Sequence, residues 1–308
     1  MGAAIGFALL AALCNAVSVL TRHVASTADP DRPTGLRLVG YLLRNPRWLA
    51  GSGAQVGAFA FQALALQFGQ ISVVQPLLVT ELVMALVLRR VFIHQAVAGP
   101  AWAGAAAACV GLAVFIVAAE PRGGHDGPTG GHWAAAVVAS VAVVASLIAL
   151  ARAGSPTRRA ALYGAAGGIT WALEATFIKS ATNDLAQAGL SGLFTSWPVY
   201  AVAVGGAAGV VIEQAALQSG PLRVSQPLLT ITDPIVSIAL SVWLFGEYFV
   251  LNPAILAAAA AGFLVMCGGV VLLSLTAPAT VEGDVDAGGD AATVRDELLW
   301  CPCRSTAC

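Results

Sequence analysis

Charged residues are scarce in this sequence: 10% of its 308 residues are Asp, Glu, Lys or Arg, whereas 58% are hydrophobic. A soluble globular domain carries roughly 25% charged residues. A surface this poor in charge is not wetted by water, so lipid is expected to surround most of the chain. The formal net charge is −1, which argues against nucleic acid as a partner.

Signals for secretion, disulfide bonding and catalysis are also lacking. A cleaved signal peptide has basic residues ahead of its apolar run, but here the first arginine, Arg22, follows that run. Cys14, Cys109 and Cys267 lie inside apolar runs, where cysteine behaves as a small hydrophobic residue, so no disulfide framework is expected. No phosphate-binding loop, Ser-His-Asp set or His-Glu-x-x-His motif occurs. We therefore expect neither an enzyme nor a cofactor.

Long apolar runs dominate the first 275 residues. A helix needs about 20 apolar residues to cross the hydrocarbon core of a bilayer. Runs of this order cover 3–20, 49–67, 71–91, 97–118, 133–152, 160–180, 195–217, 222–245 and 251–275. The sequence therefore predicts an all-α polytopic membrane protein of about nine transmembrane helices. Residues 276–308 are Gly- and Asp-rich and are expected to form a disordered cytoplasmic tail.

The arginines test this number of spans, because cytoplasmic loops carry an excess of Lys and Arg. With nine spans and an outer N-terminus, the outer loops hold only Arg122 and Lys179. The cytoplasmic segments hold thirteen arginines: Arg22, Arg32, Arg37, Arg44, Arg47, Arg89, Arg90, Arg152, Arg158, Arg159, Arg223, Arg295 and Arg304. This asymmetry favours a multi-pass protein of the cytoplasmic membrane, with its N-terminus outside and its C-terminus in the cytoplasm.

The sequence also contains an internal repeat. The segment ALQFGQISVVQPLL at 65–78 recurs as ALQSGPLRVSQPLL at 216–229, with nine of fourteen positions identical at an offset of 151. The two copies are five helices apart, and an odd displacement inverts the second copy in the membrane. Inverted repeats are typical of secondary transporters, whose substrate site lies between the halves. We predict a transporter domain over 1–275, made of a first repeat (1–120), a connector helix (133–152) and a second repeat (160–275).

The same segments resemble a known transporter family. The tandem organisation, the Gln-Pro-Leu-Leu helices and the WLFGE sequence at 243–247 are similar to EamA-like members of the drug/metabolite transporter (DMT) superfamily. LRNPRWLAG at 43–51 and TSW at 195–197, together with the nine-helix layout, resemble the NIPA-type magnesium transporters within it. This resemblance implies a transporter fold and, as one alternative, magnesium transport.

Acidic residues within the expected spans are the first candidates for a site. An ionisable group at membrane depth costs on the order of 2.5–3.5 kcal/mol on insertion scales, so it marks a functional site by default. Four such acids occur: Glu81, Glu174, Glu213 and Asp233. At the repeat offset Glu81 maps to Thr232, beside Asp233, so these two acids are near-equivalents in the two halves.

One face of the span at 222–245 is polar. Its members recur at i, i+4, i+7 and i+11, which is the spacing of a helix face: Gln226, Thr230, Asp233 and Ser237. Pro227 and Pro234 each remove a backbone donor, and carbonyl groups freed in this way line cavities in transporters. Our hypothesis is that Asp233 binds a cation or a proton. The alternative is a buried acid that hydrogen-bonds to Thr230 or Ser237 and fixes helix packing.

The other acids leave their roles open. Glu81 lies about 120° around an ideal helix from Gln75, and it either binds or packs. Glu174 is likewise consistent with binding or packing. Glu213 lies near the cytoplasmic end of its span, either solvated at the interface or lining a cavity, because its repeat partner Gln62 is also polar. The glycines are expected to let helices pack closely: Gly164, Gly167, Gly168, Gly205, Gly206 and Gly209.

Two segments outside the spans carry metal-ligating side chains. The outer loop has His125, Asp126 and His132, and the tail has Cys301, Cys303 and Cys308. Composition favours a solvated linker for the loop and a dispensable extension for the tail. A soft metal on the three thiols is the alternative for the tail.

The leading hypothesis is a secondary transporter that alternates access around a midplane site. Because acids outnumber bases in the spans, the substrate is expected to be cationic or zwitterionic. The candidate binding residues are Asp233, Glu81, Glu174, Gln226, Gln75, Thr230 and Glu213. Divalent-cation passage, with Asp233, Glu81 and Glu174 as oxygen ligands, is a second hypothesis. A non-transporting membrane scaffold is a third. The expected partners are the solute and the lipid bilayer, and a homodimer stays an open alternative.

Overall fold

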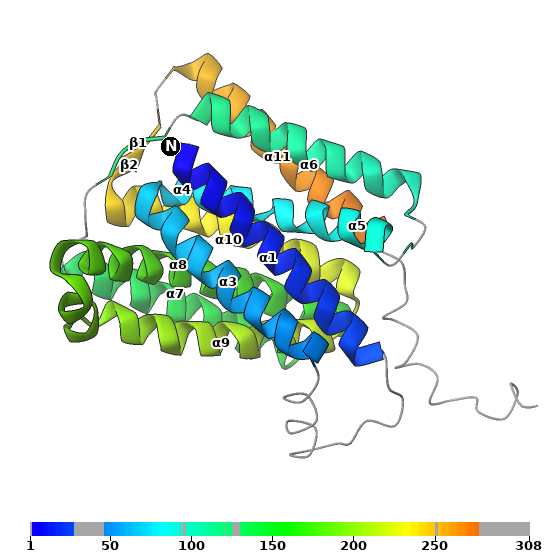
Figure 1. Ribbon diagram of the computed structural model, residues 1–308, viewed down its shortest axis with the longest axis horizontal. Helices are drawn as coiled ribbons and strands as arrows, with labels where there is room; N and C mark the ends of the chain where they lie inside the picture. The colour runs from blue at the N-terminus through cyan, green and yellow to red at the C-terminus, as the bar shows by residue number, and fades with distance from the viewer. Residues whose placement is uncertain are drawn as a thin grey trace, which may run out of the picture. The chain divides into compact units, whose positions relative to one another are not determined.

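The computed structural model describes residues 2–27, 46–92, 94, 97–119, 121–124, 130–249 and 252–276, and nearly all of them are helical (Figure 1). The helices are α1 (Gly2–Thr27), α3 (Pro46–Phe68), α4 (Ile71–Leu78), α5 (Thr80–Phe92), α6 (Gly99–Ala119), α7 (Gly130–Ala151), α8 (Pro156–Thr195), α9 (Pro198–Gln218), α10 (Leu222–Phe245) and α11 (Pro253–Thr276). Two short strands, β1 (Arg122–Gly123) and β2 (Glu247–Tyr248), complete the described elements. The tail from Ala277 to Cys308 lies outside the described residues, as do His125 and Asp126.

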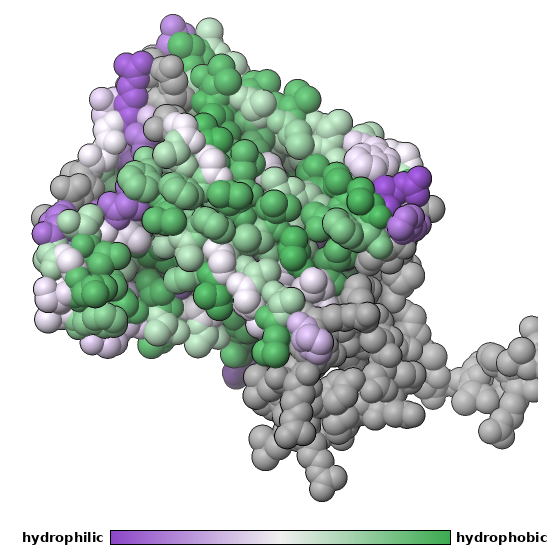
Figure 2. All heavy atoms as spheres, in the orientation of Figure 1, coloured by the Kyte–Doolittle hydropathy of each residue, from purple (hydrophilic) through white to green (hydrophobic). Residues whose placement is uncertain are grey.

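The described chain has eight helices that are long and apolar enough to cross a membrane. They are Gly2–Thr21, Leu49–Phe68, Ile71–Phe92, Gly99–Ala119, Gly131–Ala151, Pro198–Gln218, Leu222–Phe245 and Pro253–Thr276. Large hydrophobic side chains such as Val56, Val117 and Val204 are 70%, 78% and 71% exposed. Hydrophobic residues cover the middle of the face drawn in Figure 2, and hydrophilic residues gather towards the helix ends. The chain is therefore an all-α, multi-pass membrane protein, as its sequence predicts.

The span expected at 71–91 is present as Ile71–Phe92, with a local interruption of the helical hydrogen bonding at Val79. Pro76 has no N–H, and the helix is interrupted at Val79, whose N–H donates to the Pro76 carbonyl at 3.2 Å. The Thr80 hydroxyl donates to the Leu77 carbonyl at 2.7 Å and begins α5. The equivalent helix α10 contains Pro227 and Pro234 and still runs unbroken from Leu222 to Phe245.

Helix α8 is longer than expected, and its middle is fully enclosed. Its start follows from sequence, because Pro156 occupies the first turn and the Ser155 hydroxyl accepts the Arg158 N–H. Beyond the apolar run expected at 160–180, helix continues to Thr195, with a kink at Gly189 (φ 65°). Every residue from 172 to 181 is buried. A helix shielded from lipid by its neighbours does not need an apolar surface.

The two halves of the chain use the same packing scheme (Figure 1). Helix α1 packs along α3 and against α4 and α5, and helix α8 packs along α9 and α10. Helix α6 lies along α11, and α4 contacts α10, so each of these pairs joins one helix from each half. Helix α7 packs mainly on α8.

Glycines set the close approach of α6 and α11. A β-carbon on Gly104 would lie 3.0 Å from the Gly269 carbonyl oxygen, and one on Gly269 would lie 2.6 Å from the Gly104 oxygen. Gly111 and Gly262 face each other in the same reciprocal way. Gly104 faces Gly269, and Gly111, further along α6, faces Gly262, earlier in α11. The two helices are therefore antiparallel.

The helix connections separate into two ends of the bundle. At one end β1 pairs with β2 in antiparallel register, and the Gln70 amide donates to the Gly123 carbonyl at 3.3 Å. The connections after α3, α6 and α10 therefore meet there. At the other end Gly220 lies directly against the Pro156 carbonyl, which joins the connections before α8 and α10.

Candidate functional site

Glu81 has two further acids, on two other helices, within electrostatic range. Glu81 of α5 lies close enough to Glu213 of α9 and Asp233 of α10 to interact electrostatically with both. Protein atoms surround Glu81 and Asp233, and all three residues nevertheless keep part of their surface accessible. Two of the helices belong to the second half of the chain and one to the first. Below, the acid site means these three residues.

The first half of the chain supplies a hydrogen-bonded chain that ends at Glu81. The Ser18 hydroxyl donates to Gln55 Oε1 at 3.2 Å, and Gln55 Nε2 donates to Asn15 Oδ1 at 3.0 Å. The Asn15 amide, with its oxygen already engaged, hydrogen-bonds to Glu81. Asn15 and Ser18 lie on α1 and Gln55 on α3, so these two helices fix the position of an acid on α5.

In the second half of the chain, hydrogen-bond donors also hold Glu213 and Asp233 in place. The Trp171 indole N–H on α8 donates to Glu213 Oε2 at 3.1 Å. The Ser237 hydroxyl donates to Asp233 Oδ1 at 3.0 Å, four residues along α10. Glu213 is half-buried and hydrogen-bonded to Trp171 of α8, and both interpretations of this residue, as lining a cavity or lying at the interface, stay open.

Glu174 lies apart from the acid site. Its carboxylate is directed at Gly205 and Gly206 of α9, in space that a side chain at either glycine would occupy. Glu174 is 3% exposed, and its Oε2 has no hydrogen-bond partner in the described part of the chain. Gly209 meets the ring of Trp171 in the same helix interface.

The remaining predicted residues lie on α4 and α10. Gln75 is buried, and neither its amide nitrogen nor its amide oxygen has a hydrogen-bond partner among the described residues. Thr230 is buried and Gln226 is half-buried on α10. The expectation for the α8 glycines is confirmed, because Gly164 and Gly168 lie against the backbone of α10.

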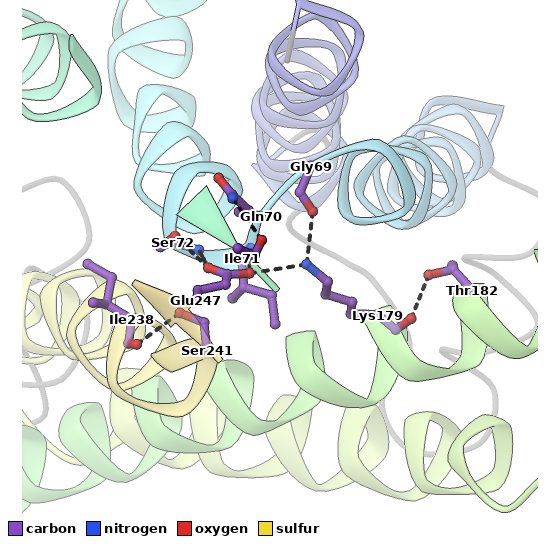
Figure 3. Close-up of polar contacts among 10 residues, drawn as sticks. Gly69, Gln70, Ile71, Ser72, Lys179, Thr182, Ile238, Ser241 and Glu247 are labelled. Atoms are coloured by element: carbon purple, nitrogen blue, oxygen red, sulfur yellow. Dashed lines mark hydrogen bonds and ion pairs between the residues drawn. The ribbon is translucent and has the colours of Figure 1, made fainter. Parts of the chain in front are cut away.

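A second polar cluster lies at the end of the bundle where β1 meets β2 (Figure 3). Lys179 of α8 donates to Glu247 Oε1 at 3.1 Å and to the Gly69 carbonyl at 3.0 Å. The same carboxylate accepts the N–H groups of Ile71 and Ser72, at 3.0 and 3.2 Å, and the Ser72 hydroxyl. It thereby caps the N-terminus of α4, where the helix dipole favours negative charge.

Sequence reasoning missed most of this cluster and the amide chain. Asn15 and Gln55 are polar residues inside apolar runs, a signal that a search restricted to ionisable groups overlooks. Lys179 is the sole lysine of the sequence, and that singularity marks it as unusual. Nothing local in the sequence pairs it with Glu247, 68 residues away.

No metal cluster is apparent in the described part of the chain. Among those residues, no three His, Cys, Asp or Glu side chains lie close enough to hold a metal ion. The set named for a divalent cation is divided in the structure, because Glu174 faces α9 whereas Glu81 and Asp233 share the acid site.

Comparison with other proteins gives one match of substantial length. The chain matches no protein-family model and no solved structure. It is 29% identical over 248 residues to an uncharacterized protein of Corynebacterium glutamicum. The match covers 80% of this chain and 86% of that protein, so the likeness extends over most of both.

Proposed function

We propose that the protein is a secondary transporter that moves a small cationic or zwitterionic solute across the cytoplasmic membrane by alternating access. Glu81, Glu213 and Asp233 bind the solute or a coupling proton, and the helices that carry them move relative to one another. The convergence of these three acids from both halves of the chain carries the proposal.

The chemistry of the acid site favours a cationic ligand. Like charges placed close together repel, and an opposite charge among them removes the penalty. Three neighbouring carboxyl groups therefore favour protons or a cation between them. The amides of Asn15 and Gln55 bond to each other, to Ser18 and to Glu81, so they position the Glu81 carboxyl group for its ligand.

Nine spans in an inverted repeat best account for the packing. Helix α8 runs from Pro156, at the Gly220 end, to Lys179, which contacts Gly69 at the opposite end. That stretch is about 35 Å long at ~1.5 Å per residue, enough to cross the hydrocarbon core although its interior position leaves it less apolar. Counting α8 gives four helices on each side of α7, as the repeat requires.

The contact between Gly111 of α6 and Gly262 of α11 supports an inverted repeat. Gly111 and Gly262 are separated by the repeat offset of 151, which was defined from other residues, at 65–78 and 216–229. A pair of equivalent residues that face each other on antiparallel helices is expected at a two-fold axis lying in the membrane plane. The arginine distribution orients this arrangement with the N-terminus outside and the C-terminus in the cytoplasm.

The proposal is tested with the full chain reconstituted in liposomes. Solute jumps with a panel of cationic and zwitterionic metabolites, under an imposed proton gradient, are expected to give transport currents on a supported membrane. Asp233→Asn and Glu81→Gln should abolish the current or shift its dependence on the proton gradient. Asp184→Asn, in the α8 extension beyond Lys179, is the matched carboxyl control and should behave as wild type. Full activity in both acid-site variants would reject this site.

Magnesium transport is the second candidate, and the resemblance to the NIPA-type transporters favours it, although no three acids among the described residues lie close enough to hold a metal ion in this conformation. Mg²⁺ prefers oxygen ligands and keeps several of its waters. Uptake of Mg²⁺ into the same liposomes, followed with an enclosed magnesium-sensitive dye, tests it directly. If neither Mg²⁺ nor any member of the solute panel moves, the scaffold hypothesis gains support over transport.

A further inference from the structure

Helices α4 and α5 differ in how tightly they are enclosed. Every residue of α4 from Ile71 to Leu77 is buried, whereas α5 has no buried residue from Thr80 to Phe92. A helix with lipid on one side and protein on the other has one buried face. Since α5 has none, it is less enclosed than α4, although Leu82, Val83 and Leu86 still pack against the core.

A polar stripe on α10 connects the acid site with the closed end. Asp233, Ser237 and Ser241 follow one another at intervals of four residues, so they lie along one side of the helix. Ser237 and Ser241 are fully buried. Gln75 on α4 is also buried, and its amide groups are without partners in the described chain, so they are free to bond to a polar group that passes.

The Lys179–Glu247 pair lies where this stripe reaches the end of the bundle (Figure 3). The Glu247 side chain is 0% exposed and that of Lys179 is 11% exposed. The Lys179 ammonium also lies 5.3 Å from the centre of the Phe245 ring. Through Glu247 the start of α4, the middle of α8 and the end of α10 are held together. Helix α4 belongs to the first half of the chain, and α8 and α10 belong to the second half.

We propose that the Lys179–Glu247 pair is the gate that closes the solute pathway at this end of the bundle. This inference rests on the proposed transport function. To open the closed end, α4 must separate from α8 and α10, which breaks the contacts on the Glu247 carboxylate. Water that enters then hydrates both charges, so the gate is reversible, whereas loss of one charge leaves the other buried and unpaired in the closed state.

Cysteine accessibility tests the gate. In the full chain with its native cysteines replaced, Ser241→Cys reports on the buried stripe, and Val270→Cys, fully buried on α11, is the control. A membrane-impermeant maleimide is applied separately to intact cells and to inside-out vesicles. Glu247→Gln and Lys179→Met should each raise the labelling rate of the Ser241→Cys reporter from the Glu247 side by about tenfold, which corresponds to about 1.4 kcal/mol in the opening equilibrium.

The outcomes separate the gate from other roles. Faster labelling of Ser241→Cys alone, from one face of the membrane, supports the gate. Unchanged labelling in both variants overturns it. Faster labelling of both reporters also overturns it, because the pair would then hold the whole fold together. Labelling does not depend on transport, so absence of solute movement by the wild type would reject the transport proposal separately.

Discussion

Gly111 and Gly262 face each other where α6 crosses α11, and a β-carbon on either would come within 3 Å of the other's carbonyl oxygen, at 2.5 and 2.8 Å. Their equivalence in the repeat places the contact on the proposed symmetry axis. Both glycines are therefore required for the same physical reason, since any side chain would push the two backbones apart.

Gly111→Ala and Gly262→Ala are expected to destabilise the protein to a similar extent. Overpacking of a closely packed interface costs typically about 1–3 kcal/mol, and here the obstacle is backbone that cannot rotate away. Thermal unfolding in detergent, followed by tryptophan fluorescence, should show a lower midpoint for both. Gly268→Ala is the control, because a β-carbon there meets nothing within 4 Å. Equal midpoints for all three variants would contradict the contact.

The amide chain on α1 and α3 leads to a prediction about solute affinity. Asn15→Ala removes the group that hydrogen-bonds to Glu81, and a hydrogen bond to a charged group contributes about 1.5–3 kcal/mol. We expect kcat/KM for transport to fall by roughly tenfold or more, mainly through KM. Ser18→Ala, two hydrogen bonds further from Glu81, should have a smaller effect. The reverse order would show that the chain serves packing and not the acid site.

The buried ion pair at the closed end predicts non-additive effects on stability. Lys179→Met leaves Glu247 without its counter-charge in the closed state and is expected to lower the unfolding midpoint, because an unpaired buried charge is destabilising. Lys179→Met combined with Glu247→Gln should cost less than the two single changes together, because no uncompensated charge is left. Unfolding midpoints of the four proteins complete the double-mutant cycle. Strict additivity would mean that the two side chains do not interact.

The sequence predicts the helices of this protein well because the bilayer imposes a simple rule. An apolar run long enough to cross must be helical, and α10 begins and ends where its run does, at 222 and 245. Eight of the nine expected runs meet the criteria for a membrane span in the structure. The exception is α8, whose buried position permits Glu174 and Lys179 within it.

The grouping of side chains was only partly predictable. The repeat offset indicated that Glu81 and Asp233 occupy similar places, and in the structure the two lie within electrostatic range of each other. Packing against other helices sets the rotation of each helix about its axis, and a run of apolar residues in the sequence does not specify that rotation. Close contact with the glycines of α9 places the Glu174 carboxylate in the α8–α9 interface, away from the other acids.

Glu174 itself gives the last prediction. Its carboxylate occupies space that a β-carbon at Gly205 would need, so Gly205→Ala should destabilise the wild-type protein. Glu174→Ala empties that space, and in this background Gly205→Ala should be tolerated. Residues in direct contact show coupling of about 0.5–3 kcal/mol in such cycles, measured here by thermal unfolding. Gly268→Ala in the same background should show no coupling. If the Gly205→Ala penalty is equally large without the Glu174 carboxylate, then α9 does not hold Glu174 in this interface, and its place among the binding candidates beside Asp233 has to be reconsidered.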